Sequence, residues 1–167
     1  MNTLGIDPGK ALGLCLYDST HARVLEAVVC TAADVDGHLH RLLPRADMTA
    51  IERVRAYGLA GKTIADGIEQ TGWLIRRCGG DCAPGSDERG IASWRVDGRL
   101  VSLERRAVLR ALSDAVGSDV RKDAGVWAAL VTLHGEGSDK KGGCLHGVKA
   151  HARSALAVAW SVANARL

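Results

Sequence analysis

The first part of the chain contains three short apolar runs, at residues 2–6, 13–17 and 23–30, and polar residues separate them. The first run leads into Asp7-Pro8-Gly9, a turn signal that predicts a strand ending at Asp7. The second run is followed by Asp18-Ser19-Thr20, again a turn composition. Three short strands joined by tight turns are typical of an antiparallel meander.

Helical and strand-like patterns alternate after the meander. The apolar positions of residues 33–43 have helical spacing, and Pro44 limits that helix. Residues 48–54 form a fourth strand-like run. Residues 59–78 then have an apolar stripe at helical spacing, interrupted by glycines that each weaken a helix by about 1 kcal/mol relative to alanine. This helix therefore needs tertiary or subunit contacts to hold it.

The second half of the chain is mainly helical. A short strand is expected at residues 91–96, after a loop rich in glycine and proline. A glycine-rich stretch at residues 135–147 is expected to be an exposed loop. Three helices are predicted, at residues 103–116, 118–133 and 149–165. An antiparallel start followed by alternating strands and helices indicates a mixed α/β sheet.

The composition fits one soluble domain, which we expect to span residues 1–167, with 47% hydrophobic and 25% charged residues. The 22 basic and 19 acidic residues give a net charge of +3, which permits a polyanionic partner without arguing for one. No run approaches the roughly 18 to 20 apolar residues of a membrane helix, and the first residues do not have the layout of a signal peptide. We therefore expect a cytoplasmic protein that has no membrane partner.

The five cysteines give little support to a disulfide framework, because the number is odd and secretory features are absent. Cys78, Cys82, Cys144 and His146 could together supply four zinc ligands. Their spacing is not a common zinc pattern, so this remains a minor alternative.

Several segments together resemble one protein family. Leu4-Gly5-Ile6-Asp7-Pro8-Gly9, followed by a second strand, resembles the start of RuvC-type Holliday-junction resolvases. Ala50-Ile51-Glu52 resembles the strand whose terminal glutamate completes the metal site of that family, and residues 59–78 resemble its dimerisation helix. Residues 151–159 resemble its final helix, where a histidine is followed three residues later by an aspartate. Compared with a lone Asp-Pro-Gly turn, this ordered set is much more specific.

The resemblance implies an RNase H-like α/β fold with a mixed five-stranded sheet flanked by helices. It also implies a catalytic site of Asp7, Glu52, His151 and Ser154, in which the first three bind Mg²⁺ or Mn²⁺. Hydrolysis of a phosphodiester by two metals needs such carboxylates, because hard cations prefer oxygen ligands.

Each of these residues also has a simpler interpretation. Asp7 could be a turn former that bonds its own backbone. Glu52 could be a solvated residue at a strand end, paired with Arg53 or Arg55. His151 could stand at the start of a helix without any ligand role.

Ser154 is the clear departure from the family pattern, which has aspartate at this position. A neutral hydroxyl neither neutralises a dication nor accepts as strongly as a carboxylate. The chain could be a divergent nuclease that uses another acid, could have lost nuclease activity, or could carry an altered residue here. Glu136 and Asp139 are the candidate substitutes, and Asp123 is a weaker one.

DNA contacts would be mainly to phosphates and would be sensitive to salt. The nearest aromatic after the expected glutamate is Tyr57, which could stack on a base at the junction. The candidate DNA-binding residues are Arg55, Tyr57, Lys62, Arg105, Arg106, Arg110, Lys122, Lys140, Lys141 and Lys149.

These observations favour a Mg²⁺-dependent, structure-selective DNA endonuclease that cleaves branched DNA and forms a homodimer through the helix at 59–78. The first alternative is a resolvase-like protein that binds branched DNA with weak or lost cleavage, because Ser154 replaces the expected acid. The second is an RNase H-like protein without nuclease activity, such as a relative of sugar kinases or ATPases. The short chain and the lack of a second phosphate-binding segment argue against this second alternative.

Overall fold

The computed structural model describes residues 1–54, 62–80, 91–94 and 99–164. Within this part of the chain, six strands form one mixed sheet of order β3-β2-β1-β4-β6-β5. The strands are β1 (Asn2–Asp7), β2 (Leu12–Asp18), β3 (Arg23–Cys30), β4 (Met48–Arg53), β5 (Ile91–Trp94) and β6 (Leu100–Glu104). The first three strands form the expected antiparallel meander, and β4 pairs parallel with β1. The predicted mixed sheet flanked by helices is confirmed, with a sixth strand added to the five expected.

The added strand is β6, whose residues the apolar pattern had assigned partly to a helix. Leu103, taken as the first residue of a helical stripe, lies on β6 and is buried. β6 pairs parallel with β4 and antiparallel with β5, so sheet pairing on both edges holds it extended. Glu104 keeps an extended backbone, and the helix begins at Arg105. The helical pattern from Ala107 onward was correctly assigned, whereas its start was wrong because tertiary pairing outweighs local periodicity.

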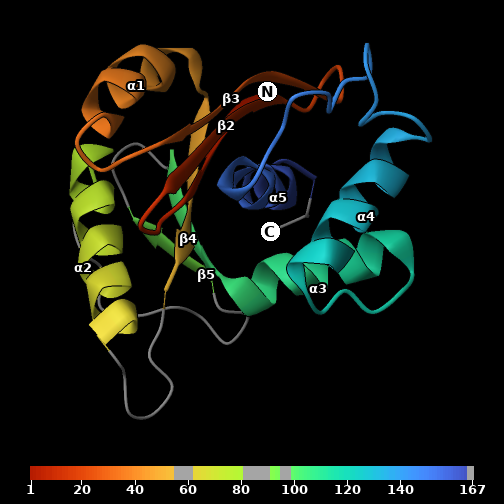
Figure 1. Ribbon diagram of the computed structural model, residues 1–167. Coiled ribbons are helices and arrows are strands. Elements are labelled where there is room, and N and C mark those ends of the chain that lie inside the picture. Colours follow the sequence, from red (N-terminus) through yellow and green to blue (C-terminus); the bar gives the residue numbers. More distant parts are fainter. Residues whose placement is uncertain (55–61, 81–90, 95–98, 165–167) are drawn as a thin grey trace.

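The helices cover both faces of the sheet (Figure 1). They are α1 (Val35–Leu42), followed by a short 3-10 turn, Leu43–Arg45, then α2 (Lys62–Arg77), α3 (Arg105–Val116), α4 (Asp123–His134) and α5 (His151–Asn164). α1 and α2 pack with Leu4, Ile6 and Leu14 of the sheet on one face. α3, α4 and α5 pack on the other face, against side chains such as Cys15 and Tyr17. Helices on both faces explain why every residue of β2 is buried.

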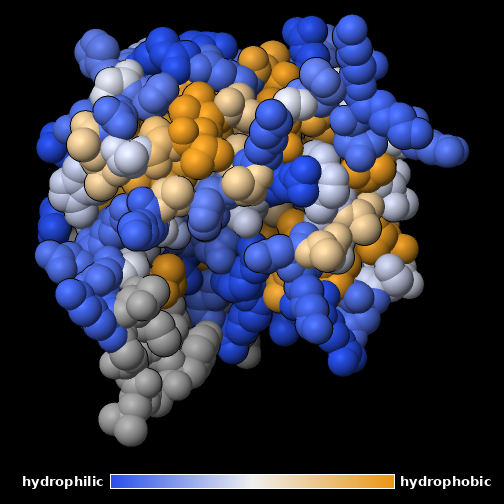
Figure 2. All heavy atoms as spheres, viewed as in Figure 1, coloured by the Kyte–Doolittle hydropathy of each residue, from blue (hydrophilic) through white to orange (hydrophobic). Residues whose placement is uncertain are grey.

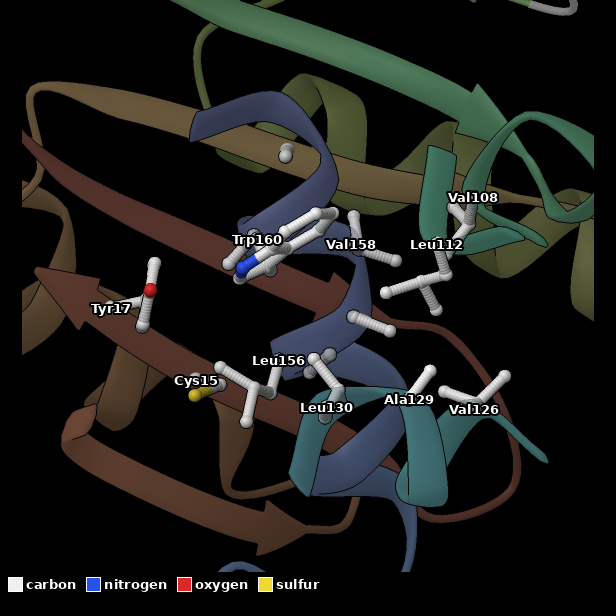
Figure 3. Close-up of a cluster of buried hydrophobic side chains, with 14 of the residues drawn as sticks. Cys15, Tyr17, Val108, Leu112, Val126, Ala129, Leu130, Leu156, Val158 and Trp160 are labelled. Atoms are coloured by element: carbon white, nitrogen blue, oxygen red, sulfur yellow. The ribbon is translucent and has the colours of Figure 1, made fainter. Parts of the chain in front are cut away.

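The core on the α5 face is built from small aliphatic side chains. Figure 3 shows Leu156 and Val158 of α5 among side chains of α3 and α4, including Leu112 and Leu130. α5 is buried along nearly its whole length between Ala152 and Ser161, as its apolar composition predicted. α5 begins at His151 rather than at residue 149, because Ala150 has a left-handed backbone with φ of 42°.

The remaining differences lie in loops. α4 begins at Asp123 instead of residue 118, since Lys122 has an extended backbone. The stretch at 135–147 exposes Lys140 and Lys141 as expected, yet Leu145 is fully buried, so this loop also closes the core. No helix in the part of the chain described here is long and apolar enough to span a membrane.

The closest approach in the fold is between α5 and the first two strands. Gly5 of β1 faces the backbone at Ala155 and Ala159, and Gly13 of β2 faces the backbone at His151. A Cβ atom at either glycine would lie 2.0 Å from a carbonyl oxygen of α5. Glycine is therefore required at both positions, and it fixes the height at which α5 starts above the strand ends.

Replacing Gly13 with Ala is expected to destabilise the protein by about 3 kcal/mol, because α5 must move away from the sheet. Unfolding in urea, followed by circular dichroism, measures this loss. Gly37→Ala is the matched control: no atom lies within 4 Å of its Cβ, and a helix interior gains about 0.5 to 1 kcal/mol from the change. A Gly13→Ala variant as stable as the parent protein would contradict the close approach.

Candidate active site

Two carboxylates lie side by side where parallel strands end. Ile6 of β1 is in register with Ile51 of β4, so the next residues, Asp7 and Glu52, occupy equivalent positions on neighbouring strands. Both strands run in the same direction, which brings their carboxyl ends to the same edge of the sheet. The pKa of Glu52 is raised, mainly by burial and also by the negative charge of Asp7, in agreement with this proximity. The expectation that the two acids converge is thus met by the fold.

Asp7 is buried and makes a specific contact with the last helix. Its side chain is 12% exposed, and its Oδ2 atom lies 2.9 Å from Nδ1 of His151, the first residue of α5. Burial raises the pKa of Asp7, and the hydrogen bond and charge of His151 partly offset that rise. Asp7 is therefore more than a turn former, and His151, although it begins a helix, also contacts the acid.

Glu52 is nearly as enclosed, with 13% of its side chain exposed. Burial raises its pKa to about 7, while the nearby positive charge of Arg105 works in the opposite direction. Nη1 of Arg105 donates a hydrogen bond to Oε2 of Glu52 at 3.1 Å. The carboxylate is thus paired with an arginine of α3, rather than with Arg53 of its own strand.

Arg105 also reaches a third acid. Its Nη2 atom donates to Oδ1 of Asp123, the first residue of α4, so one guanidinium joins Glu52 and Asp123. The charge of Asp123 raises the pKa of both Asp7 and Glu52. Asp123, the weakest of the three substitute acids suggested by the sequence, therefore acts electrostatically on this site. Arg105, expected to contact DNA phosphates, is engaged within the site itself.

Ser154 lies one helical turn after His151 and is half-buried. Within the described part of the chain, no group of three or more His, Cys, Asp or Glu side chains is placed to hold a metal ion. The donor chemistry nevertheless fits Mg²⁺ or Mn²⁺, because Asp7 and Glu52 offer adjacent hard oxygen ligands at one strand edge. Mg²⁺ is usually held by one or two protein carboxylates together with water and substrate phosphates, so a pair is a sufficient protein contribution.

The zinc alternative is wrong for Cys78 and Cys144, which lie on opposite faces of the sheet. Cys78 packs against the α1 and α2 face of the sheet, whereas Cys144 packs against the α5 face. The sheet lies between them, so they cannot share a metal ion. Cys82 is outside the described residues.

The candidate DNA-binding residues are spread over several elements. Figure 2 shows hydrophilic side chains gathered at the lower centre of the molecule, near the end of β4 and the start of α3 in Figure 1. Arg106 is exposed there and forms an ion pair with Glu104 at 2.8 Å. Arg55 and Tyr57 lie outside the described residues. The others that are exposed are Lys62, Arg110, Lys122, Lys140, Lys141 and Lys149.

The chain is similar to known proteins in its structure but matches none of the compared families or curated sequences. Among solved structures, RuvC of Thermus thermophilus in complex with a Holliday junction substrate is similar, with a TM-score of 0.56 and 20% identity. That likeness covers 99% of this chain and 95% of the other. The chain has a RuvC-like fold. A second Thermus thermophilus RuvC structure gives a TM-score of 0.53 and 17% identity, over 99% and 96% of the two chains.

The feature that the sequence did not reveal is the bridge from Glu52 through Arg105 to Asp123. These residues are far apart in the chain and belong to β4, α3 and α4. Arg105 follows a strand that the apolar pattern did not predict, so its position next to β4 carried no local signal. Only the pairing of β6 with β4 brings the start of α3 to Glu52.

Replacing Glu52 with Gln should change how stability depends on pH. The folded pKa of about 7 lies above the usual 4.5, so between these values the folded protein binds more protons than the unfolded chain. Glu52 therefore stabilises the fold below about pH 4.5, and this contribution is lost as the pH rises through about 7. Relative to the parent protein, the variant should gain up to about 3 kcal/mol between those pH values. Urea unfolding at both pH values measures it, and an unchanged difference would mean that Glu52 titrates normally.

Proposed function

We propose that the chain is a structure-selective DNA endonuclease that cleaves branched DNA, such as Holliday junctions, with Mg²⁺ or Mn²⁺. The observation that carries this proposal is the pairing of Asp7 and Glu52 at adjacent parallel strand ends, next to His151. The fold adds support, because a similar structure is a RuvC bound to a Holliday junction substrate. Two buried carboxylates with raised pKa values at a strand edge are typical of catalytic and ion-binding sites.

In the proposed enzyme, Asp7 and Glu52 would hold the divalent cation through their carboxylate oxygens. Such a cation, when bound, would supply activation of water and stabilisation of the leaving oxygen. His151 holds the carboxylate of Asp7 through Nδ1, which fixes the direction of that ligand. Ser154, on the same face of α5, contributes a neutral hydroxyl rather than a third negative ligand.

A second candidate function is binding of branched DNA without cleavage. Ser154 favours it, because the position expected to carry an acid is neutral. In this case the exposed lysines and arginines would still bind phosphates, and binding would not need a metal.

The proposed enzyme acts as a homodimer through α2. A four-way junction has two symmetric strands to cut, and a two-fold dimer presents two equivalent sites to them. Ile68 on α2 is 42% exposed, so this helix presents a large apolar side chain on which a partner could pack.

The variant Ile68→Glu is expected to shift the protein toward the monomer, because a charge would be buried in the proposed interface. Sedimentation velocity measures the two species. Val29→Glu, on β3 and 43% exposed, is the matched control and should leave the dimer intact. A parent protein that sediments as a monomer would contradict the dimer.

The nuclease proposal predicts that the parent protein cuts a synthetic four-way junction when Mg²⁺ or Mn²⁺ is present. Asp7→Asn should abolish cutting while leaving junction binding in place, because the amide cannot neutralise a dication. Removing one ligand of a metal-dependent reaction should lower the rate by about a hundredfold or more. Gel electrophoresis of end-labelled junctions measures cleavage, and a mobility shift without metal measures binding.

Ser154→Asp separates the two candidate functions. If the parent protein cleaves weakly, restoring the acid should raise the rate at equal metal concentration, because a further carboxylate faces the site from α5. A junction left intact equally by the parent protein and by Asp7→Asn would refute the nuclease proposal. Tight binding in that experiment would support the binding protein.

A further inference from the structure

A guanidinium group already occupies the space next to Glu52. Nη1 of Arg105 lies 3.1 Å from the Glu52 carboxylate, and Nη2 of the same group donates to Asp123. The Arg105 side chain is 29% exposed, so its charge is partly shielded from solvent. Burial raises the pKa of Asp7, and the charge of Arg105, together with His151, works in the opposite direction. Arg105 is thus the cation that both carboxylates of the proposed metal site experience.

A divalent cation bound by Glu52 would be repelled by Arg105. Charges of +2 and +1 a few ångströms apart repel strongly in a partly buried site, where the effective dielectric constant is about 20. Arg105 already neutralises part of the negative charge of the Glu52 carboxylate that a metal would need. The Arg105–Glu52 ion pair and a metal on Glu52 therefore compete for the same carboxylate.

Asp123 gives Arg105 a second place to bind. Its side chain is 89% exposed at the first turn of α4, on the solvent side of Arg105. Arg105 can therefore leave Glu52 and still keep a carboxylate partner. Both acids are already within reach of the one guanidinium, so Arg105 can keep its bond to Asp123 when it releases Glu52.

We propose that Arg105 is a positioning residue that holds Glu52 in the metal-free protein and is displaced toward Asp123 when a divalent cation binds Asp7 and Glu52. This inference rests on the proposed function for the identity of the metal site. Without metal, Arg105 is the counter-charge of Glu52, and Asp123 makes the release of Arg105 from Glu52 easier. Arg105 therefore lowers the affinity for metal, and Asp123 raises it.

The test measures Mn²⁺ binding in the absence of DNA, by electron paramagnetic resonance of free Mn²⁺. All variants are measured at the same pH and ionic strength, so that only the substituted side chain differs. Arg105→Gln should bind Mn²⁺ about tenfold more tightly than the parent protein, because the competing charge is gone. Arg121→Gln is the matched control: it removes the same charge from an arginine that is 81% exposed, and its affinity should not change.

A structural role for Arg105 gives the opposite result. If the arginine only holds Glu52 in a productive orientation, Arg105→Gln binds Mn²⁺ as weakly as the parent protein or more weakly, and the proposal is overturned. The same holds if neither protein binds Mn²⁺. Circular dichroism verifies that the variant is folded, and Arg105→Lys, which keeps the charge, should stay close to the parent affinity.

A double-mutant cycle separates the role of Asp123 from direct metal binding. Asp123→Asn should weaken Mn²⁺ binding about threefold in the parent protein, because Arg105 then has Glu52 as its remaining carboxylate partner in this bridge. In the Arg105→Gln background the loss should be clearly smaller, because only the through-space charge of Asp123 is then removed. An equal loss in both backgrounds would mean that Asp123 acts on the cation without Arg105, which would overturn the displacement. Because neither DNA nor cleavage enters these measurements, they can fail while the nuclease proposal stands, and the reverse is equally possible.

Discussion

The backbone of α5 lies directly against Gly5 of β1 and Gly13 of β2, and the arrangement of the site depends on this contact. Because a side chain at either position would collide with α5, glycine at both lets the helix lie directly on the two strands. Its first residue, His151, consequently stands beside Asp7 at the end of β1. Two features that look independent in the sequence, a pair of glycines in strands and a histidine near residue 150, are thus parts of one packing constraint.

The same close packing determines the electrostatics. Strands covered on both faces carry their terminal acids into a partly buried edge, and burial raises the pKa of Asp7 and of Glu52. Each acid has a basic partner from a different helix, His151 from α5 and Arg105 from α3. Without these partners two neighbouring carboxylates would both resist ionisation. The helices therefore do more than cover the sheet, since they supply the basic groups that favour the ionised forms of Asp7 and Glu52.

Much of this arrangement could be predicted from the sequence, because its signals are local. The turn at Asp7-Pro8-Gly9 fixed the end of β1, and the ordered set of Asp7, Glu52 and His151 identified the acids and their histidine. β6 could not be predicted, since its residues are extended only through pairing with β4 and β5. The role of Arg105 depends on that pairing. The sequence also could not predict that Asp123 lies near Arg105, because its position depends on where α4 begins.

The charge balance of the site affects how the proposed enzyme would bind metal and DNA. Ser154 removes one negative charge from the pattern expected of a resolvase, and Arg105 offsets another by pairing with Glu52. In the proposed enzyme, a site with so little excess negative charge would bind a lone dication weakly, while a phosphodiester would add negative oxygen ligands and a competing partner for Arg105. Metal and DNA would then favour each other's binding, since each would relieve an interaction that opposes the other. The substrate would supply the ligands that Asp7 and Glu52 do not.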